Sequence, residues 1–123
     1  MQQAVLAYQQ VARRTVSPRD LEANLLSRSA ANLQRARDAW GDRDEFRAAL
    51  RFNRRLWNVL LTSVTREDNP LPAAIRQNVA NLGLFILNHT IKLEANPQAQ
   101  KLDVLININR ELAAGLRTLP VHN

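Results

Sequence analysis

Histidines are the first side chains of this sequence that could hold a metal ion or transfer a proton. The chain contains two of them, His89 and His122, and no cysteine. A metal site needs several ligands that converge on one ion, and His122 is the next-to-last residue. His89 falls on the inner side of a predicted helix, where a hydrogen-bonded core imidazole explains it better than a metal ligand. We therefore expect no bound metal and a structural role for His89.

Clustered carboxylates are the second group that could do chemistry. They occur in Asp42-Arg43-Asp44-Glu45 and in Glu67-Asp68. Both clusters fall beside loops at predicted helix ends, where capping accounts for acidic side chains without any catalysis. Carboxylates that act as acid and base need a buried cleft, and the sequence carries no glycine-rich phosphate loop, nucleophile elbow or dinucleotide fingerprint. The sequence therefore predicts neither enzymatic activity nor a cofactor.

Arginines form the densest charged group of the chain. Arg47, Arg51, Arg54 and Arg55 follow one another at steps of 4, 3 and 1 residues, which places them on one outer face of a helix. Such an arginine ridge could track nucleic-acid phosphates or dock an acidic partner. It could equally be a solvated face whose surface ion pairs contribute little stability. We favour the solvated face, because no aromatic side chain is interleaved to stack on bases.

Length and composition indicate a single helical domain, residues 1–123. Of the 123 residues, 46% are hydrophobic and only 5% aromatic, with 3 glycines and 5 prolines. Few helix breakers and many Leu, Ala and Arg residues favour helix over sheet. A net charge of +6 raises the odds of an anionic partner, but the charge is spread along the whole chain. As evidence for nucleic-acid binding it is weak.

No membrane or export signal is apparent. The N-terminal residues lack the basic-then-apolar pattern of a signal peptide. The longest uncharged run, 77–91, is too short and too rich in Asn for a membrane span. We expect a soluble, cytoplasmic protein that does not insert into a membrane.

Apolar residues recur with helical spacing in five segments. They cover residues 4–14, 18–40, 44–66, 72–94 and 98–116. Ser17 and Asp44 are predicted N-caps, and Gly41 is a predicted C-terminal stop. The first segment is short and marginal as an isolated helix. Because the connections are short, the long helices should be antiparallel neighbours. The predicted fold is all-α: a compact bundle of about five helices, one short N-terminal helix and four longer antiparallel ones.

Inner faces can be assigned to the long helices from the same spacing. In the second helix we expect Leu21, Leu25, Leu33, Ala36 and Trp40 to face inward. In the third helix we expect Phe46, Ala49, Leu50, Asn53, Leu56, Trp57, Leu60 and Val64. In the last helix the stripe is Leu102, Leu105, Ile106, Asn109, Leu112, Ala113 and Leu116.

The helix predicted over 72–94 is apolar almost all the way round. One face carries Ile75, Val79, Leu82, Ile86, His89 and Leu93, and roughly the opposite face carries Leu84, Leu87 and Ile91. A helix that is apolar on both sides cannot lie at the rim of a small domain unless something covers it. Either this helix is central in the bundle, or one of its flanks waits for a partner.

Two asparagines interrupt the apolar stripes at Asn53 and Asn109. A buried amide is costly unless it is hydrogen-bonded, so each amide should bond to something specific. We favour mutual bonding in the core, which would fix the helix register. The alternative is that they reach the backbone of a partner through a groove.

Several pieces of the sequence, in their order and spacing, resemble the FlaF family of flagellar biosynthesis regulatory proteins of alphaproteobacteria. The pieces are Tyr8, the helix start at 17–23 (SPRDLEA), the segment 49–57 (ALRFNRRLW), the break at 69–72 (NPLP), and 105–110 (LININR) followed by Gly115-Leu116. The resemblance extends over nearly the whole chain.

The resemblance implies a cytoplasmic factor that couples flagellin production to flagellum assembly. Such proteins are described as secretion chaperones for flagellin and as modulators of its synthesis together with a second regulator, FlbT. Flagellin ends are amphipathic helices, and a chaperone would cover their apolar faces in a groove between helices. The candidate groove residues are Tyr8, Phe52, Leu56, Val59, Leu84, Leu87 and Ile91. The alternative is an RNA-binding regulator of the flagellin message that acts through the arginine ridge.

Overall fold

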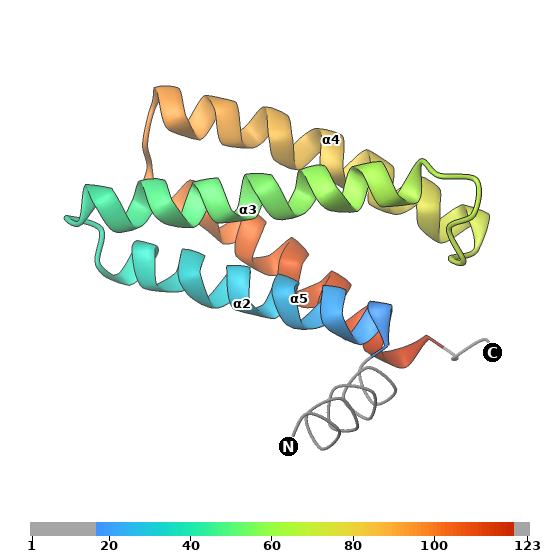
Figure 1. Ribbon diagram of the computed structural model, residues 1–123. Helices are drawn as coiled ribbons and strands as arrows, with labels where there is room; N and C mark the ends of the chain where they lie inside the picture. The colour runs from blue at the N-terminus through green and yellow to red at the C-terminus, as the bar shows by residue number, and fades with distance from the viewer. Residues whose placement is uncertain (1–16, 120–123) are drawn as a thin grey trace, which may run out of the picture.

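The computed structural model describes residues 17–119, which form four long α-helices and no strand (Figure 1). The helices are α2 (Pro18–Asp38), α3 (Arg43–Val64), α4 (Ala73–Ala95) and α5 (Leu102–Thr118), and the short 3-10 helix η1 (Ala99–Lys101) leads into α5. The all-α class and the four long helices are therefore confirmed. The short helix predicted over 4–14 lies outside the described residues.

The helix ends follow local capping chemistry, with two departures from the prediction. Ser17 caps α2 as expected, since its Oγ accepts a hydrogen bond of 3.1 Å from the Asp20 amide. The N-cap of α3 is Asp42 rather than Asp44, because the Asp42 carboxylate accepts a 3.0 Å bond from the Glu45 amide. Helix α2 ends at Asp38 with Ala39 as its C-cap, before Gly41, and no glycine among the described residues adopts a positive φ. Gly41 therefore lies in the connecting turn and does not cap α2.

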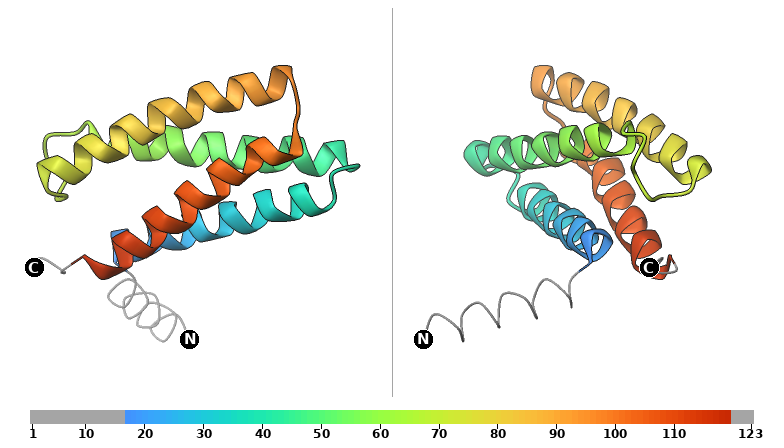
Figure 2. Two further views of the ribbon diagram at one scale, coloured as in Figure 1. Left: turned by 180° about the vertical axis from the view of Figure 1, so that it is seen from behind. Right: turned by 45° about the vertical axis from the view of Figure 1, so that its right-hand side comes forward.

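Polar contacts between helices define their directions. In the α2/α3 pair, Arg35 lies 3.5 Å from Glu45 in an ion pair, and Ser29 bonds to Asn53 further along. Helices α3 and α4 form a second antiparallel pair. Helix α5 packs most extensively along α2, in the antiparallel direction, and runs at an angle beneath α3 (Figure 2). Arg37 bonds to Asp103 at one end of this α2/α5 pair, and Arg117 bonds to Asn24 at the other.

Helix α3 has α2 and α4 as its main neighbours, on two sides. All eight of its predicted inner residues are buried, and Trp57 has no exposed surface. The prediction for α2 is partly wrong. Leu21 is 53% exposed, and Leu25 and Trp40 are only partly buried. Near its N-terminus α2 buries Ala23 and Leu26, which lie roughly on the opposite side of the helix from Leu21.

Helix α4 lies at the edge of the bundle, with α3 as its main neighbour (Figures 1 and 2). The two helices approach closely at Gly83, where an added Cβ would lie 2.6 Å from the Leu61 side chain. At the start of α4, Arg76 donates hydrogen bonds of 3.0 Å to the carbonyl oxygens of Val64 and Arg66. A cation at this position satisfies free carbonyls at the end of α3. Of the two alternatives for this helix, the central position is therefore wrong.

Candidate functional site

A chain of buried polar side chains links three helices in the interior. Ser29 of α2 donates a 2.8 Å hydrogen bond to Asn53 Oδ1 of α3, which also accepts a 2.7 Å bond from Asn109 Nδ2 of α5. Trp57 Nε1 in turn donates to Asn109 Oδ1 at 2.9 Å. Ser29, Asn53, Trp57 and Asn109 have no exposed surface. The two asparagines thus bond to each other within the core.

The donor-only indole fixes how these amides are oriented. Because Trp57 N–H can only donate, Asn109 must present its oxygen to the indole and its NH₂ to Asn53. Asn53 therefore presents its oxygen to Asn109, and its Nδ2 is left buried without a hydrogen-bond partner. This orientation ties α3 to α5 at one register. It leaves no amide of the pair facing outward toward a partner's backbone.

His89 lies at the rim of the core, which corrects the prediction that it is an interior residue. Its side chain is half-buried, and Nε2 lies 2.8 Å from the carbonyl oxygen of Lys101. The ring stacks on Phe85 with centroids 5.4 Å apart. The fully buried polar residue of α4 is Thr90, which bonds to the Ile86 carbonyl. On this side of α4, the bond to Lys101 joins His89 to the 3-10 helix that leads into α5.

An apolar flank on α4 is open to solvent. It consists of Leu84, Leu87 and Ile91, which follow one another on successive turns. Leu84 is 65% exposed and Ile91 is 62% exposed, whereas Leu87 is half-buried against the core. Large apolar side chains that stay exposed on one side of a helix, here Leu84 and Ile91, can mark an interaction surface.

Two other groove candidates, Phe52 and Val59, lie on the other side of α3. Phe52 is half-buried under the guanidinium of Arg28 from α2, 5.5 Å from the ring centroid. Val59, two turns further on the same face, is 65% exposed. Phe52 and Leu61, the residue that meets α4, are nine residues apart, or about two and a half turns. Phe52 and Val59 therefore do not form one groove with the apolar flank.

Two further groove candidates add nothing to an open surface on the described part of the chain. Leu56 is buried, with 8% of its surface exposed. It contributes to packing rather than to a groove. Tyr8 lies outside the described residues.

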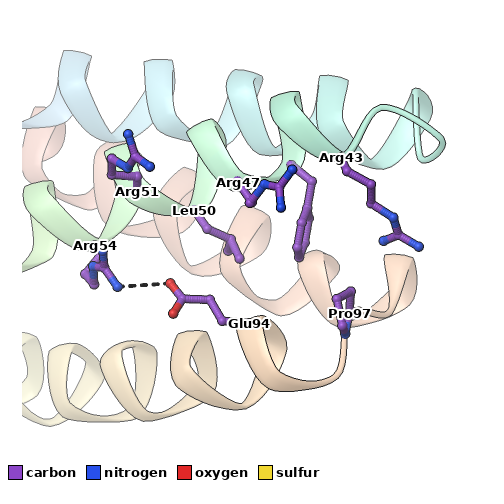
Figure 3. Close-up of a pocket in the computed structure, with 8 residues that line it drawn as sticks. Arg43, Arg47, Leu50, Arg51, Arg54, Glu94 and Pro97 are labelled. Atoms are coloured by element: carbon purple, nitrogen blue, oxygen red, sulfur yellow. Dashed lines mark hydrogen bonds and ion pairs between the residues drawn. The ribbon is translucent and has the colours of Figure 1, made fainter.

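The arginines line a cleft between the start of α3 and the end of α4. This arginine cleft has a volume of about 350 Å³ and is lined by Arg43, Phe46, Arg47, Leu50, Arg51, Arg54, Glu94 and Pro97. Figure 3 shows the arginines above Glu94 and Pro97. Arg55, which the sequence grouped with the ridge, does not line the cleft. Arg43 was missed, although its spacing of four residues from Arg47 repeats the spacing between Arg47 and Arg51.

The charges of the arginine cleft are only partly balanced. Arg54 pairs with Glu94 at 3.0 Å, and Arg47 pairs with Asp44 at 3.0 Å across one helical turn. Arg43 lies over the Trp40 ring, 4.9 Å from its centroid. Arg51 makes no ion pair or hydrogen bond among the described residues. The cleft therefore presents a net positive wall above a floor of Phe46 and Leu50, both buried.

Within residues 17–119 no three side chains are grouped as a metal site would require. In the same range, no helix combines the length and apolarity that crossing a bilayer demands. Neither the curated proteins nor the solved structures contain a match to this chain. A protein-family model does match it: the family is described as flagellar protein FlaF, and the match covers residues 4–116.

Proposed function

The chain belongs to the FlaF family of flagellar proteins, and from this premise we propose that it binds flagellin in the cytoplasm as an export chaperone and regulator of flagellin synthesis. It acts by association, without catalysis. FlbT is the second regulator with which it would modulate synthesis.

The observation that carries the proposal is the apolar flank of α4. Leu84 and Ile91 are each more than 60% exposed, although burying such a side chain is worth about 1.5–3 kcal/mol. An amphipathic helix recovers that free energy when it lays its own apolar face on the flank, with anchors spaced i, i+3, i+4 and i+7. Flagellin ends are amphipathic helices of this type, and covering them prevents premature polymerisation.

Because α3 is the main neighbour of α4, and Leu84 and Ile91 are exposed, the outer side of α4 is accessible without unfolding the bundle. Next to the apolar flank, the close contact between Gly83 and Leu61 leaves no space between α3 and α4. A partner helix would therefore pack beside α4 as an added helix, and the half-buried Leu87 would lie at the base of the contact.

The test compares Leu84→Glu with Val59→Glu. Both residues are 65% exposed, both lie in helices, and they occupy different sides of α3. Binding to flagellin purified from the same organism is measured by isothermal titration calorimetry. We expect Leu84→Glu to weaken binding tenfold or more, about 1.4 kcal/mol, and Val59→Glu to leave it unchanged.

Circular dichroism of both variants provides the control for folding, since neither change buries a charge. Loss of binding in Val59→Glu alone would place the partner on the α2 side of α3. Full binding by a folded Leu84→Glu would refute the flank as the contact surface.

A further inference from the structure

The apolar flank and the arginine cleft are continuous along α4. Ile91 belongs to the flank, and Glu94, one helical turn further, lines the cleft. From Leu84 to Glu94 the axial distance is about 15 Å at 1.5 Å per residue. On the facing helix, Arg54, Arg51, Arg47 and Arg43 follow in antiparallel order toward Pro97. A single elongated surface thus changes from apolar to cationic at one end.

We propose that the arginine cleft binds the acidic C-terminal end of a partner helix whose apolar face lies on the flank. The partner helix then runs parallel to α4, with its last turn at the arginines. This inference rests on the proposed function, and it adds which chemistry the partner must carry and in which direction it binds.

Charge complementarity carries the first step. Four arginines line the cleft against one carboxylate, Glu94, so the site is electropositive before any partner arrives. Arg54 already binds the Glu94 carboxylate at 3.0 Å, which demonstrates that a carboxylate fits between α3 and α4. Arg51 has no partner among the described residues and is available for a second carboxylate.

The helix dipole carries the second step. The C-terminal end of a helix bears a partial negative charge of about half an elementary unit on its free carbonyl groups. Those carbonyls and any acidic side chains in the last turn would both be neutralised by the arginines. The N-terminal end of the partner helix would instead meet repulsion, and this fixes the direction.

The apolar floor favours a protein partner over a polynucleotide. Phe46 and Leu50 are buried beneath the arginines, with 3% and 1% of their surfaces exposed. Neither ring nor side chain is available for stacking on a base, which single-stranded nucleic acid requires for tight binding. The adjoining surface is the apolar flank of α4 rather than a continued basic track.

The probe is a hydrocarbon-stapled, C-terminally amidated amphipathic peptide of about 20 residues, long enough to span flank and cleft. One version carries three glutamates in the last turn, a second carries glutamines there, and a third carries the glutamates in the first turn. Stapling keeps all versions equally helical. We expect the first version to bind about tenfold more tightly than the other two, because its carboxylates meet a cleft of net positive charge in which Arg51 has no partner among the described residues.

The matched variants are Arg51→Glu and Arg55→Glu. They introduce the same charge change on the exposed side of the same helix, but only Arg51 lines the cleft. Arg51→Glu should remove most of the preference for the glutamate peptide, because it lowers the charge of the residues that line the cleft from +3 to +1. Arg55→Glu should leave that preference in place. Glu94→Gln should strengthen binding of the glutamate peptide several-fold, because it frees Arg54.

Each contrary result has a defined meaning. Equal binding of the glutamate and glutamine peptides, or no binding of either, overturns the inference. If Leu84→Glu still abolishes flagellin binding in that case, the proposed function stands without it. Stronger binding of the peptide with glutamates in its first turn refutes the direction. Salt-sensitive binding of a single-stranded RNA oligomer that Arg51→Glu alone abolishes would reassign the cleft to phosphates.

Discussion

Replacing Trp57 with alanine probes the point where packing and hydrogen bonding meet in the core. The Trp57 side chain has no exposed surface and donates a 2.9 Å bond to Asn109 Oδ1. Truncating a buried aromatic residue to alanine costs about 3–5 kcal/mol. The same change leaves the Asn109 oxygen buried without a donor, at a further cost of about 1–3 kcal/mol. The sum approaches the total stability of many domains, about 5–15 kcal/mol.

Two variants separate these contributions. Trp57→Phe keeps most of the apolar volume and removes only the donor, so it should lose about 1–3 kcal/mol. Adding Asn109→Leu to Trp57→Phe removes the Asn109 oxygen that Trp57→Phe leaves without a donor. It also removes the Asn109 NH₂ that donates to Asn53 Oδ1, but Ser29 still donates to that oxygen. The double variant should therefore be less destabilised than the two single losses added together.

Urea unfolding followed by far-ultraviolet circular dichroism measures these free energies. The slope of the unfolding curve also reveals whether a variant is fully folded at the outset. If the free energy of unfolding of Trp57→Ala lay within about 1 kcal/mol of that of the parent, the core assignment would be refuted, because truncating a buried tryptophan costs far more than that. If that variant were stable yet unable to bind flagellin, Trp57 would be an interface anchor.

Two further predictions concern packing and titration. Gly83→Ala should lower stability by about 1 kcal/mol, because overpacking against Leu61 costs more than the gain in helix propensity. Gly115→Ala, whose added Cβ meets nothing within 4 Å, should raise stability by up to about 1 kcal/mol. Urea unfolding of both variants measures the two changes. Burial raises the pKa of the Glu22 carboxyl, against the opposing charge of Arg19. The folded state therefore binds the carboxyl proton more tightly than the unfolded state does. The stability that this proton contributes is lost as pH rises through the raised pKa. Glu22→Gln should therefore stabilise the protein at neutral pH and not at about pH 3, where the parent carboxyl is protonated; equal effects at both values would contradict the burial argument.

The inner face of α3 could be predicted because its packing follows from one local pattern. Residues from Phe46 to Val64 repeat on a single stripe, and neighbours on two sides bury all of it. Asn53 interrupts that stripe with a polar group, and its predicted partner, Asn109, is the residue that it meets. The helix-level pattern suffices where the apolar residues of a helix collect on a single stripe.

The outer surfaces could not be predicted in the same way. Apolar residues occur on nearly all sides of α4, so its sequence does not predict which side packs against a neighbouring helix. One close approach to α3 is made by Gly83, which has no side chain and therefore leaves no hydrophobic signal. Phe52 and Leu84 were both recognised as surplus apolar residues, but only the three-dimensional arrangement places α3 between them.

The arginines illustrate a similar limit. Spacing grouped Arg55 with Arg51, because four residues along a helix return the side chain to within about 40° of the same direction. Whether an arginine lines the cleft depends on where α4 ends, and Glu94 and Pro97 are some forty residues further along the chain. The sequence identifies the charges, whereas the long-range pairing of α3 with α4 selects those that share a site.

The edge position of α4 explains how an apolar flank can stay exposed without loosening the fold. Polar contacts fix α4 to α3 at both ends, through Arg76 at the carbonyls that end α3 and through the Arg54–Glu94 pair. Close packing at Gly83 fixes the middle. Since none of these contacts involves Leu84 or Ile91, a partner can occupy the flank without breaking them. In the proposed function, binding at Leu84 and Ile91 therefore uses another side of α4 than the one that packs on α3, and a Leu84 variant that stays folded tests binding alone.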